Sequence, residues 1–418
     1  MKKTLAMILC MMLLISTIVG CSKNEDAMGG NGVSQEASTQ DDGSQTTDGI
    51  LSTDATPPTD QNEQTDSATE SPDVENNVET VPSEATTVDF EAAYAAYQPD
   101  TLMVRAGGYN VMWDELFLQL FGSVNAILYS YAGMLPNWTD RLSDGRTYAQ
   151  AVMDFAVDYA IMFKALEYGA EINSVTLGED DYVVLQNDMQ NAIDSVGSEE
   201  DFLRVLWEEN GCRTLELYKY LCDTSYLANA TFNKLYGENG ELMSDEDLAD
   251  YTSMDGFLMA KHILCLKQDD DEGAAKAEAE SILASLNSYN GNDFDSFFDE
   301  LMLEYSDDSG GLQSYPDGYL FQPGDMVPSF TEACAALDIG SYSGLVESDY
   351  GYHIIYRLPI DYDAIPFANY MQNDYSPLRY LTATSLFNSQ ILLWRDMLAP
   401  EYTSEYDSIE IADLFAWQ

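Results

Sequence analysis

The chain has 418 residues, of which 73 are Asp or Glu and 17 are Lys or Arg, giving a formal net charge of -56. This charge repels polyanions and therefore excludes nucleic acid as a partner. An apolar content of 45% still supports a sizeable core, so the excess acid must lie on surfaces and tails.

The first 20 residues have the pattern of a secretory signal peptide. Lys2 and Lys3 precede an apolar run at 5–19, which is shorter than a membrane-spanning helix. The run ends in the sequence IVGC at 18–21, which resembles the lipobox of bacterial lipoproteins. We therefore expect residues 1–20 to be a lipoprotein signal peptide and Cys21 to carry the lipid, since two acyl chains anchor a protein stably. The alternative is an ordinary secretory signal with an incidental cysteine.

Residues 21–88 form a polar segment, rich in Ser, Thr, Gln and Asn, with 15 acidic residues and one Lys. Such a segment cannot bury enough apolar surface to offset the entropy of ordering it. We expect a disordered acidic linker that separates the folded part from the membrane.

Residues 89–254 are expected to form a mainly helical domain. A short extended stretch at 101–105 and a turn at 106–108 precede the first helical pattern. Apolar periodicity and capping signals then predict helices from about 112 and at 148–168, 180–196, 199–210, 213–236 and 244–251.

The pattern changes at 255–361, where strands and helices are mixed. It predicts a buried strand at 257–266, helices at 271–286, 293–305 and 329–337, and a strand pair at 346–358. A long helical pattern at 365–402 then falls within residues 362–418, which we expect to complete the helical domain. The fold class is therefore α+β, with a small and mostly antiparallel sheet and its surrounding helices inserted into a mainly helical domain.

Histidine and cysteine are too sparse for most metal sites. The chain has two histidines, His262 and His353, and no CxxC pair with zinc spacing. We expect neither a metal nor another cofactor. Cys212, Cys222, Cys265 and Cys334 are expected to be buried free thiols. A disulfide between Cys212 and Cys222 is the alternative in an exported protein.

Five blocks within 255–361 resemble the parvulin family of peptidyl-prolyl isomerases. In chain order they are AKHIL at 260–264, YSDDSGG at 305–311, GDMVPSF at 324–330, LDIGSYS at 337–343 and GYHII at 351–355. The order of lipobox, helical region, parvulin module and returning helix resembles the PrsA-type foldase lipoproteins. The helical region is also similar, more weakly, to that of the chaperone SurA.

This resemblance implies a catalytic set of His262, Asp308 and His353. The two histidines would be the paired central histidines on adjacent strands, and Asp308 would face the substrate carbonyl. Taken singly, each histidine is more typical of a hydrogen-bonded core residue. The resemblance favours the functional interpretation.

The resemblance also implies a substrate-binding set. Met326 and Phe330 would form the proline pocket, and Ser348 would lie near His353. In the loop 312–320 the chain departs from the shorter Gly-Asp-Leu-Gly turn of the family, and Leu320 is the candidate for the pocket wall. The pair at 307–308 is acidic and has no Arg or Lys cluster beside it, which disfavours phosphorylated substrates.

We therefore expect a lipid-anchored foldase on the outer face of the bacterial cytoplasmic membrane. It would isomerise X-Pro bonds in newly exported proteins and hold them while they are unfolded, and its acidic surface would favour basic clients. The alternative is a holdase whose parvulin module only binds peptide. A solute-binding lipoprotein would explain the lipobox but not the five blocks. The sequence leaves open whether the chain forms a homodimer.

Overall fold

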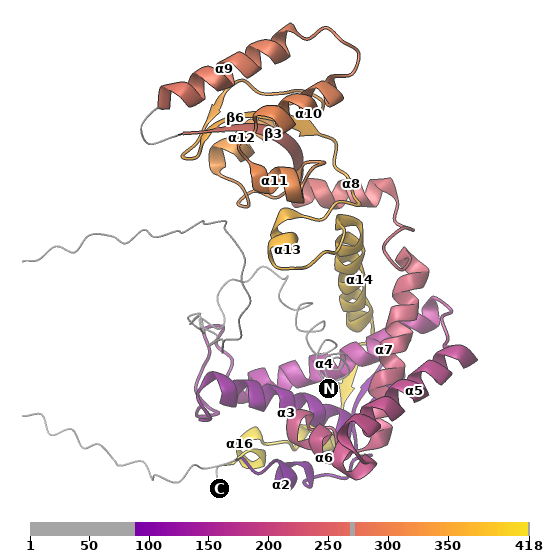
Figure 1. Cartoon of the computed structure of the whole chain (residues 1–418). Helices are drawn as coiled ribbons and strands as arrows, with labels where there is room; N and C mark the ends of the chain where they lie inside the picture. The colour runs from indigo at the N-terminus through magenta and orange to yellow at the C-terminus, as the bar shows by residue number, and fades with distance from the viewer. Residues whose placement is uncertain (1–87, 268–271, 417–418) are drawn as a thin grey trace, which may run out of the picture.

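The computed structural model describes residues 88–267 and 272–416. The predicted signal peptide at 1–20, the lipid-bearing Cys21 and nearly all of the predicted linker at 21–88 lie outside these residues. The described part is a mixed α+β structure, as the sequence predicts. It comprises a helical region and a smaller module, and the module lies at the N-terminal end of helix α14 (Leu378–Met397; Figure 1).

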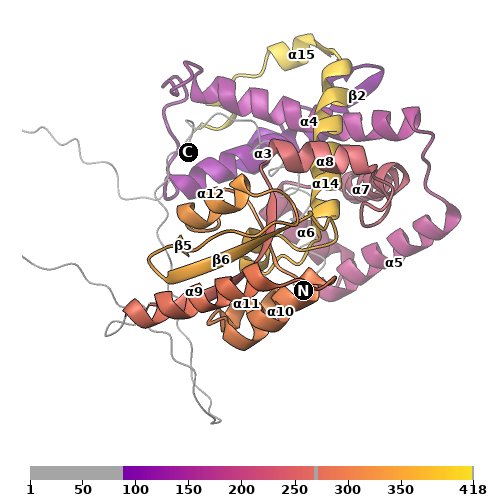
Figure 2. The ribbon, with the colours of Figure 1, turned by 90° about the horizontal axis from the view of Figure 1, so that it is seen from above.

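The module is built on a four-stranded antiparallel sheet with the strand order β4-β3-β6-β5. Its strands are β3 (Leu258–Leu266), β4 (Tyr319–Phe321), β5 (Val346–Glu347) and β6 (Gly351–Leu358). Its helices are α9 (Glu272–Ser288), α10 (Phe294–Tyr305), α11 (Ser309–Ser314) and α12 (Pro328–Ala336). Helices α9 and α10 cover one face of the sheet and α12 lies on the other (Figure 2). The sequence did not predict α11 and β4, which are too short to show a periodic pattern.

The helical region follows the predicted elements closely. Its helices are α2 (Phe90–Tyr94), α3 (Trp113–Ser130), α4 (Tyr148–Ile172), α5 (Glu179–Val196), α6 (Glu199–Asn210), α7 (Leu215–Tyr236) and α8 (Asp245–Met254). Side-chain caps fix several starts: the Thr147 and Gln150 side chains form a capping box at α4, and the Ser198 hydroxyl accepts from the Asp201 N–H at α6.

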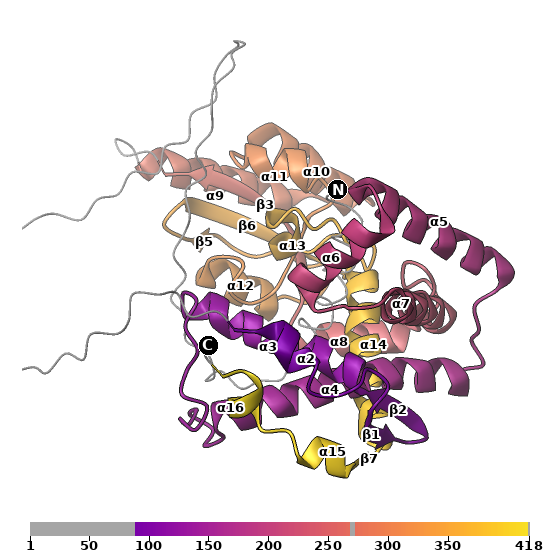
Figure 3. The ribbon, with the colours of Figure 1, turned by 90° about the horizontal axis from the view of Figure 1, so that it is seen from below.

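A second, three-stranded sheet joins the two ends of the described chain. Strand β1 (Leu102–Ala106) pairs antiparallel with β2 (Tyr109–Met112) on one side and with β7 (Pro400–Tyr402) on the other (Figure 3). Gly107 and Gly108 form the β1–β2 turn with positive φ. Two short helices, α15 (Ser404–Asp407) and α16 (Ile411–Leu414), follow β7. The sequence predicted only the first of these strands: β2 was missed because it runs directly into the helical pattern of α3, and β7 because pairing between positions about 300 residues apart leaves no local signal.

The predicted long helix at 365–402 is wrong as a single element. It is divided into α13 (Phe367–Met371) and α14 (Leu378–Met397), because Asn373 adopts a positive φ and Pro377 disfavours a helical residue before it. Helix α14 packs on α4 at Gly169, where an added Cβ would lie 2.2 Å from the Trp394 ring. The returning chain therefore belongs to the same core as α3 and α4.

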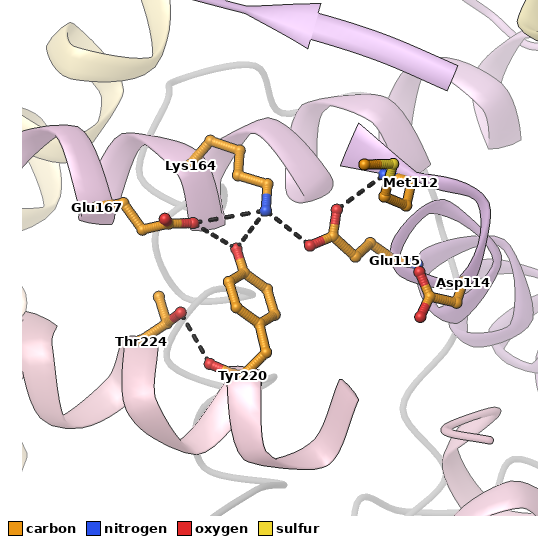
Figure 4. A network of polar contacts seen from close by, with 7 residues as sticks. All are labelled: Met112, Asp114, Glu115, Lys164, Glu167, Tyr220 and Thr224. Carbon is orange, nitrogen blue, oxygen red and sulfur yellow. Dashed lines mark hydrogen bonds and ion pairs between the residues drawn. The ribbon is translucent and has the colours of Figure 1, made fainter. Parts of the chain in front are cut away.

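A buried lysine ties three helices of this region together. Lys164 of α4 is 5% exposed, and its ammonium donates to Glu115 of α3 and to the Tyr220 hydroxyl of α7, both at 2.7 Å (Figure 4). The Tyr220 hydroxyl donates in turn to Glu167 at 2.7 Å. The second Glu115 oxygen accepts from the Met112 N–H at 2.9 Å. The buried ammonium of Lys164 is thus compensated by two carboxylates and a hydroxyl.

The structure bears on two further points, whether a helix could cross a membrane and the state of the thiols. Within 88–267 and 272–416, every helix is too short or too polar to cross a bilayer. All four cysteines of the described residues are free thiols, so the alternative disulfide between Cys212 and Cys222 is not formed; Cys212, Cys265 and Cys334 are buried as predicted, whereas Cys222 is only half-buried. Burial raises the pKa of the Cys212 thiol to about 12, which keeps it protonated and unreactive.

Candidate active site

The two histidines lie on the central strands of the module sheet and on the same face. His262 belongs to β3 and His353 to β6, and the register pairs His262 with Ile355 and His353 with Leu264. They are therefore diagonal neighbours of an antiparallel pair, close enough for long side chains to touch. Their rings stack with an interplanar angle of 18°, and the two Nδ1 atoms are 3.1 Å apart. The fold thus brings together residues that are 91 positions apart in the chain.

Each ring has a second polar partner. His262 Nε2 lies 2.8 Å from Asp308 Oδ2, and His353 Nε2 lies 2.7 Å from Ser348 Oγ. The Ser348 oxygen also accepts weakly from the N–H groups of Tyr350 and Gly351, so its own proton is free to be donated to His353.

With both imidazoles neutral, these contacts have one consistent set of protons. An ionised Asp308 requires His262 to donate from Nε2, which leaves Nδ1 of His262 as an acceptor. His353 then donates from Nδ1 and accepts from Ser348 at Nε2. The result is a continuous chain from Ser348 through His353 and His262 to Asp308, in which both imidazoles are neutral. We assign these protons from the hydrogen-bond network.

The environment favours these charge states. Burial, and then the neighbouring His262, lower the pKa of His353 to about 4, so the ring is neutral at pH 7. For Asp308, burial acts to raise the pKa, but hydrogen bonds from His262, Tyr319 and the Gly311 N–H outweigh it. They hold the pKa of the Asp308 carboxyl well below its usual range, and the group stays ionised.

An apolar ring stands at the edge of both imidazoles. Phe330 of α12 is 3% exposed and meets His262 at 5.2 Å and His353 at 5.6 Å between ring centroids, nearly perpendicular to each. Met326 is half-buried and packs in the same cluster, although it precedes α12 rather than sharing a helical turn with Phe330. Phe330 therefore lies beside the histidines, and Met326 packs against the apolar cluster to which Phe330 belongs.

A small cavity lies behind Asp308, on the side of Ser306 and Tyr315. Its volume is about 10 Å³, which is close to the space of a single water molecule and too small for a proline ring. In 88–267 and 272–416, no three His, Cys, Asp or Glu side chains are grouped so as to hold a metal ion.

A comparison with known protein families identifies the module. Residues 262–358 match the family described as Rotamase, PPIC-type PPIase domain. The match begins at one histidine of the pair and extends past the other. These residues form a PPIC-type PPIase domain.

Known foldases and chaperones are similar to segments of this chain. The foldase protein PrsA of Oceanobacillus iheyensis is 30% identical over 190 residues, which cover 44% of this chain and 56% of PrsA. PrsA of Halalkalibacterium halodurans is 33% identical over 163 residues, covering 38% and 44%. The chaperone SurA of Chromohalobacter salexigens is 45% identical over 58 residues, covering 14% and 13%. The matches thus span about half the length of the two PrsA relatives.

A solved structure of PrsA from Bacillus cereus aligns over 67% of this chain and 97% of its own, with 21% identity and a TM-score of 0.27. At this TM-score the two chains do not superpose as wholes.

One predicted residue of the PPIase domain is placed away from the site. Leu320 is fully buried, but it packs with Phe257, Met259 and Leu378 on the face of β4 that points away from the histidines. The prediction that Leu320 forms the pocket wall is therefore wrong, because successive residues of a strand point to opposite faces. Its neighbour Tyr319 faces His262 instead, at 5.7 Å between ring centroids.

Tyr319 and Gly311 are the site residues that sequence reasoning missed. The Tyr319 hydroxyl donates to Asp308 Oδ2 at 2.7 Å, and the Gly311 N–H donates to Oδ1 at 2.9 Å. The available signal for Gly311 was its position three residues after Asp308, since an Asp at a helix N-cap accepts from that N–H. For Tyr319 the signal was the loop itself, where the chain departs from the family pattern.

Proposed function

We propose that the chain is a peptidyl-prolyl cis/trans isomerase that acts on exported proteins. The observation that carries this proposal is the hydrogen-bonded chain of Ser348, His353, His262 and Asp308 beside the ring of Phe330. The family match of 262–358 and the similarity to PrsA support it.

The chemistry needs neither a nucleophile nor a metal. Rotation about an X-Pro bond has a barrier of about 18 to 20 kcal/mol, because the amide loses its resonance in the twisted state. A site lowers this barrier when it favours the twisted amide over either planar isomer. An apolar surface at Phe330 and Met326 would hold the proline ring, and the polar chain would provide fixed hydrogen-bonding groups that suit the altered charge of the carbonyl.

In this proposal His262, Asp308 and His353 are the catalytic residues, and Met326, Phe330 and Ser348 contact or orient the substrate. Neutral imidazoles suit this task, because a charged ring next to an apolar ring would hold water in the site. Asp308 would fix the tautomer of His262 and orient both rings rather than transfer a proton itself.

A peptide assay tests the activity. The purified chain should accelerate cis to trans conversion of a short unphosphorylated X-Pro peptide, and His262→Ala should lower kcat/KM by about tenfold or more, as expected when a fixed polar group is removed. Tyr315→Phe is a matched control, because the Tyr315 hydroxyl has no hydrogen-bond partner among the described residues. A rate equal to buffer would reject the isomerase and leave the alternative, a holdase that only binds peptide.

We further propose that the helical region holds unfolded clients. Three large side chains at the end of α3 and in the following loop are exposed, namely Tyr129 at 91%, Tyr131 at 42% and Met134 at 62%. Exposed apolar groups of this kind are what an unfolded chain can cover. The module at 255–361 and the helical parts at 89–254 and 362–418 would then act on the same client in turn.

Lipid anchoring belongs to the same proposal. The sequence IVGC at 18–21 supports lipid attachment at Cys21 and a location on the outer face of the cytoplasmic membrane. Cys21→Ser should move the chain from the membrane fraction to the soluble fraction in cells that process lipoproteins. Retention of this variant in the membrane would contradict a lipid anchor at Cys21.

A further inference from the structure

The loop that departs from the parvulin pattern delivers a tyrosine hydroxyl to the candidate active site. Tyr319 is the first residue of β4 and pairs with Ala260 of β3. Strand alternation therefore gives Tyr319 and Phe321 the face that carries the histidines. From there the Tyr319 hydroxyl donates to Asp308 Oδ2 at 2.7 Å, the same oxygen that accepts from His262 at 2.8 Å.

Two glycines make this approach possible. An added Cβ at Gly311 would lie 2.2 Å from the Tyr319 hydroxyl and 2.3 Å from Asp308 Oδ2, so a side chain there would occupy the place where the two groups meet. Gly318, directly before Tyr319, has a φ of +107° and runs close to the Ala260 carbonyl. The chain thus turns into β4 in a conformation that favours glycine, and this turn sets the direction of the tyrosine.

Other aromatic rings hold Tyr319 from the outside. Its ring contacts Tyr315 at 4.6 Å and Phe367 at 5.8 Å between centroids, and Phe367 also contacts Tyr315 at 5.7 Å. Tyr370 adds a further contact to Tyr315 at 5.0 Å. Phe367 and Tyr370 belong to α13, which lies outside the residues 262–358 of the PPIase domain. The support of the tyrosine therefore comes in part from the segment that leads back into the helical region.

The Tyr319 hydroxyl helps to fix the orientation of the Asp308 carboxylate. With three donors around it, the carboxylate has one preferred orientation, and Oδ2 faces His262. Without the tyrosine, His262 would be the remaining hydrogen-bond partner of Oδ2 among the described residues, and the carboxylate could turn about its bond. His262 would then lose the fixed acceptor that selects its Nε2–H tautomer, and the defined donor on His353 would be lost with it.

We propose that Tyr319 is a positioning residue of the isomerase site: its hydroxyl fixes Asp308 and through it the tautomers of His262 and His353, and α13 braces its ring. The effect on catalysis rests on the proposed function, but the effect on the histidines does not. The two can therefore be measured separately.

Histidine NMR on the full chain gives the decisive measurement, because His262 and His353 are the only histidines in the sequence. With ¹⁵N-labelled histidine, the unaltered chain should show His262 as the Nε2–H tautomer and His353 as the Nδ1–H tautomer at pH 7. In Tyr319→Phe, the Nδ1 and Nε2 shifts of His262 should move toward each other as the tautomers exchange. Tyr315→Phe removes a hydroxyl from the neighbouring ring that makes no hydrogen bond within the described part, and it should leave both histidines unchanged.

The isomerase assay provides the second readout. Tyr319→Phe should lower kcat by roughly tenfold, the lower end of the effect of one lost hydrogen bond to a charged group, with a smaller change in KM. Phe367→Leu keeps the hydroxyl but weakens the brace, so it should shift the His262 signals in the same direction by a smaller amount. It also serves as the test if Tyr319→Phe fails to fold.

Histidine spectra of Tyr319→Phe that are identical to those of Tyr315→Phe would overturn the proposal. Unchanged spectra in Phe367→Leu would overturn the bracing by α13. If the His262 tautomer changes as expected but no form of the chain isomerises an X-Pro peptide, the positioning role of Tyr319 stands and the proposed function fails.

Discussion

The helical region and the PPIase domain each contain a buried base, a carboxylate and a tyrosine hydroxyl, but they use them differently. In the helical region, Lys164 is ionised and contacts Glu115, Glu167 and Tyr220 from three helices. In the PPIase domain, the bases are His262 and His353, which are neutral and lie in line between Ser348 and Asp308.

The different placement of charge in the two networks indicates a different role for each. The lysine cluster satisfies a fixed charge, and loss of Lys164 would leave two half-buried carboxylates without their cation, so it serves to hold helices together. The histidine chain carries its single charge on Asp308, at one end, and His353 changes protonation only near its lowered pKa of about 4. Such a chain can respond to a ligand or to pH, whereas the lysine cluster remains in one state.

The largest expected effect comes from removing the lysine. Lys164→Ala should lower the free energy of unfolding of the helical region by about 3 to 5 kcal/mol, because the half-buried carboxylates of Glu115 and Glu167 lose their cation and the buried Lys164 side chain is removed. Urea unfolding followed by tryptophan fluorescence measures this region alone, since all five Trp residues lie outside 255–361.

Lys219→Ala is the matched control for Lys164→Ala. Lys219 forms an exposed pair with Asp223 on α7, and such pairs contribute at most about 1 kcal/mol. If both variants lost the same small amount, the lysine cluster would not be the element that fixes the helices.

A smaller effect should separate the two regions by pH. His353 has a pKa of about 4 in the folded chain against an ordinary value of 6.5, so the unfolded chain binds more protons between these values. The free energy of unfolding of the PPIase domain should therefore fall as pH is lowered from about 6.5 to about 4 and then level off with respect to His353. At 1.36 kcal/mol per pKa unit the loss is about 3 kcal/mol. Below the ordinary pKa of Asp308, its stabilising contribution is lost as well.

Asp114 of α3 should act in the opposite direction in the helical region. Burial, and then the charge of Glu115, raise the pKa of Asp114 to about 6, so the folded state binds more protons and this contribution rises as pH falls through 6. Urea titrations at pH 7 and 4.5, followed by histidine NMR for the domain and by tryptophan fluorescence for the helical region, compare the two. A PPIase domain that is equally stable at both pH values would contradict the buried neutral His353.

The sequence predicted the elements whose signals are local. Strands β3 and β6 carry continuous apolar runs, and α4 and α6 carry capping residues, so their positions follow from periodicity. The break at Pro377 was missed although proline is a local signal, because the helical periodicity resumes directly after it. The face of Leu320 was missed for another reason: a three-residue strand gives no indication of which of its side chains points to the sheet face that carries the histidines.

The sequence by itself predicted an α+β module within a helical region, because these elements depend on residue types and spacing, and the resemblance of its five blocks to parvulins implied that His262 and His353 are a central pair. Only the tertiary structure decided that Tyr319 rather than Leu320 reaches the site, that Lys164 finds its partners on α3 and α7, and that β7 joins β1. Each of these is a contact between residues that are distant in the chain or a choice between two faces of a strand, and the folded backbone alone fixes such geometry.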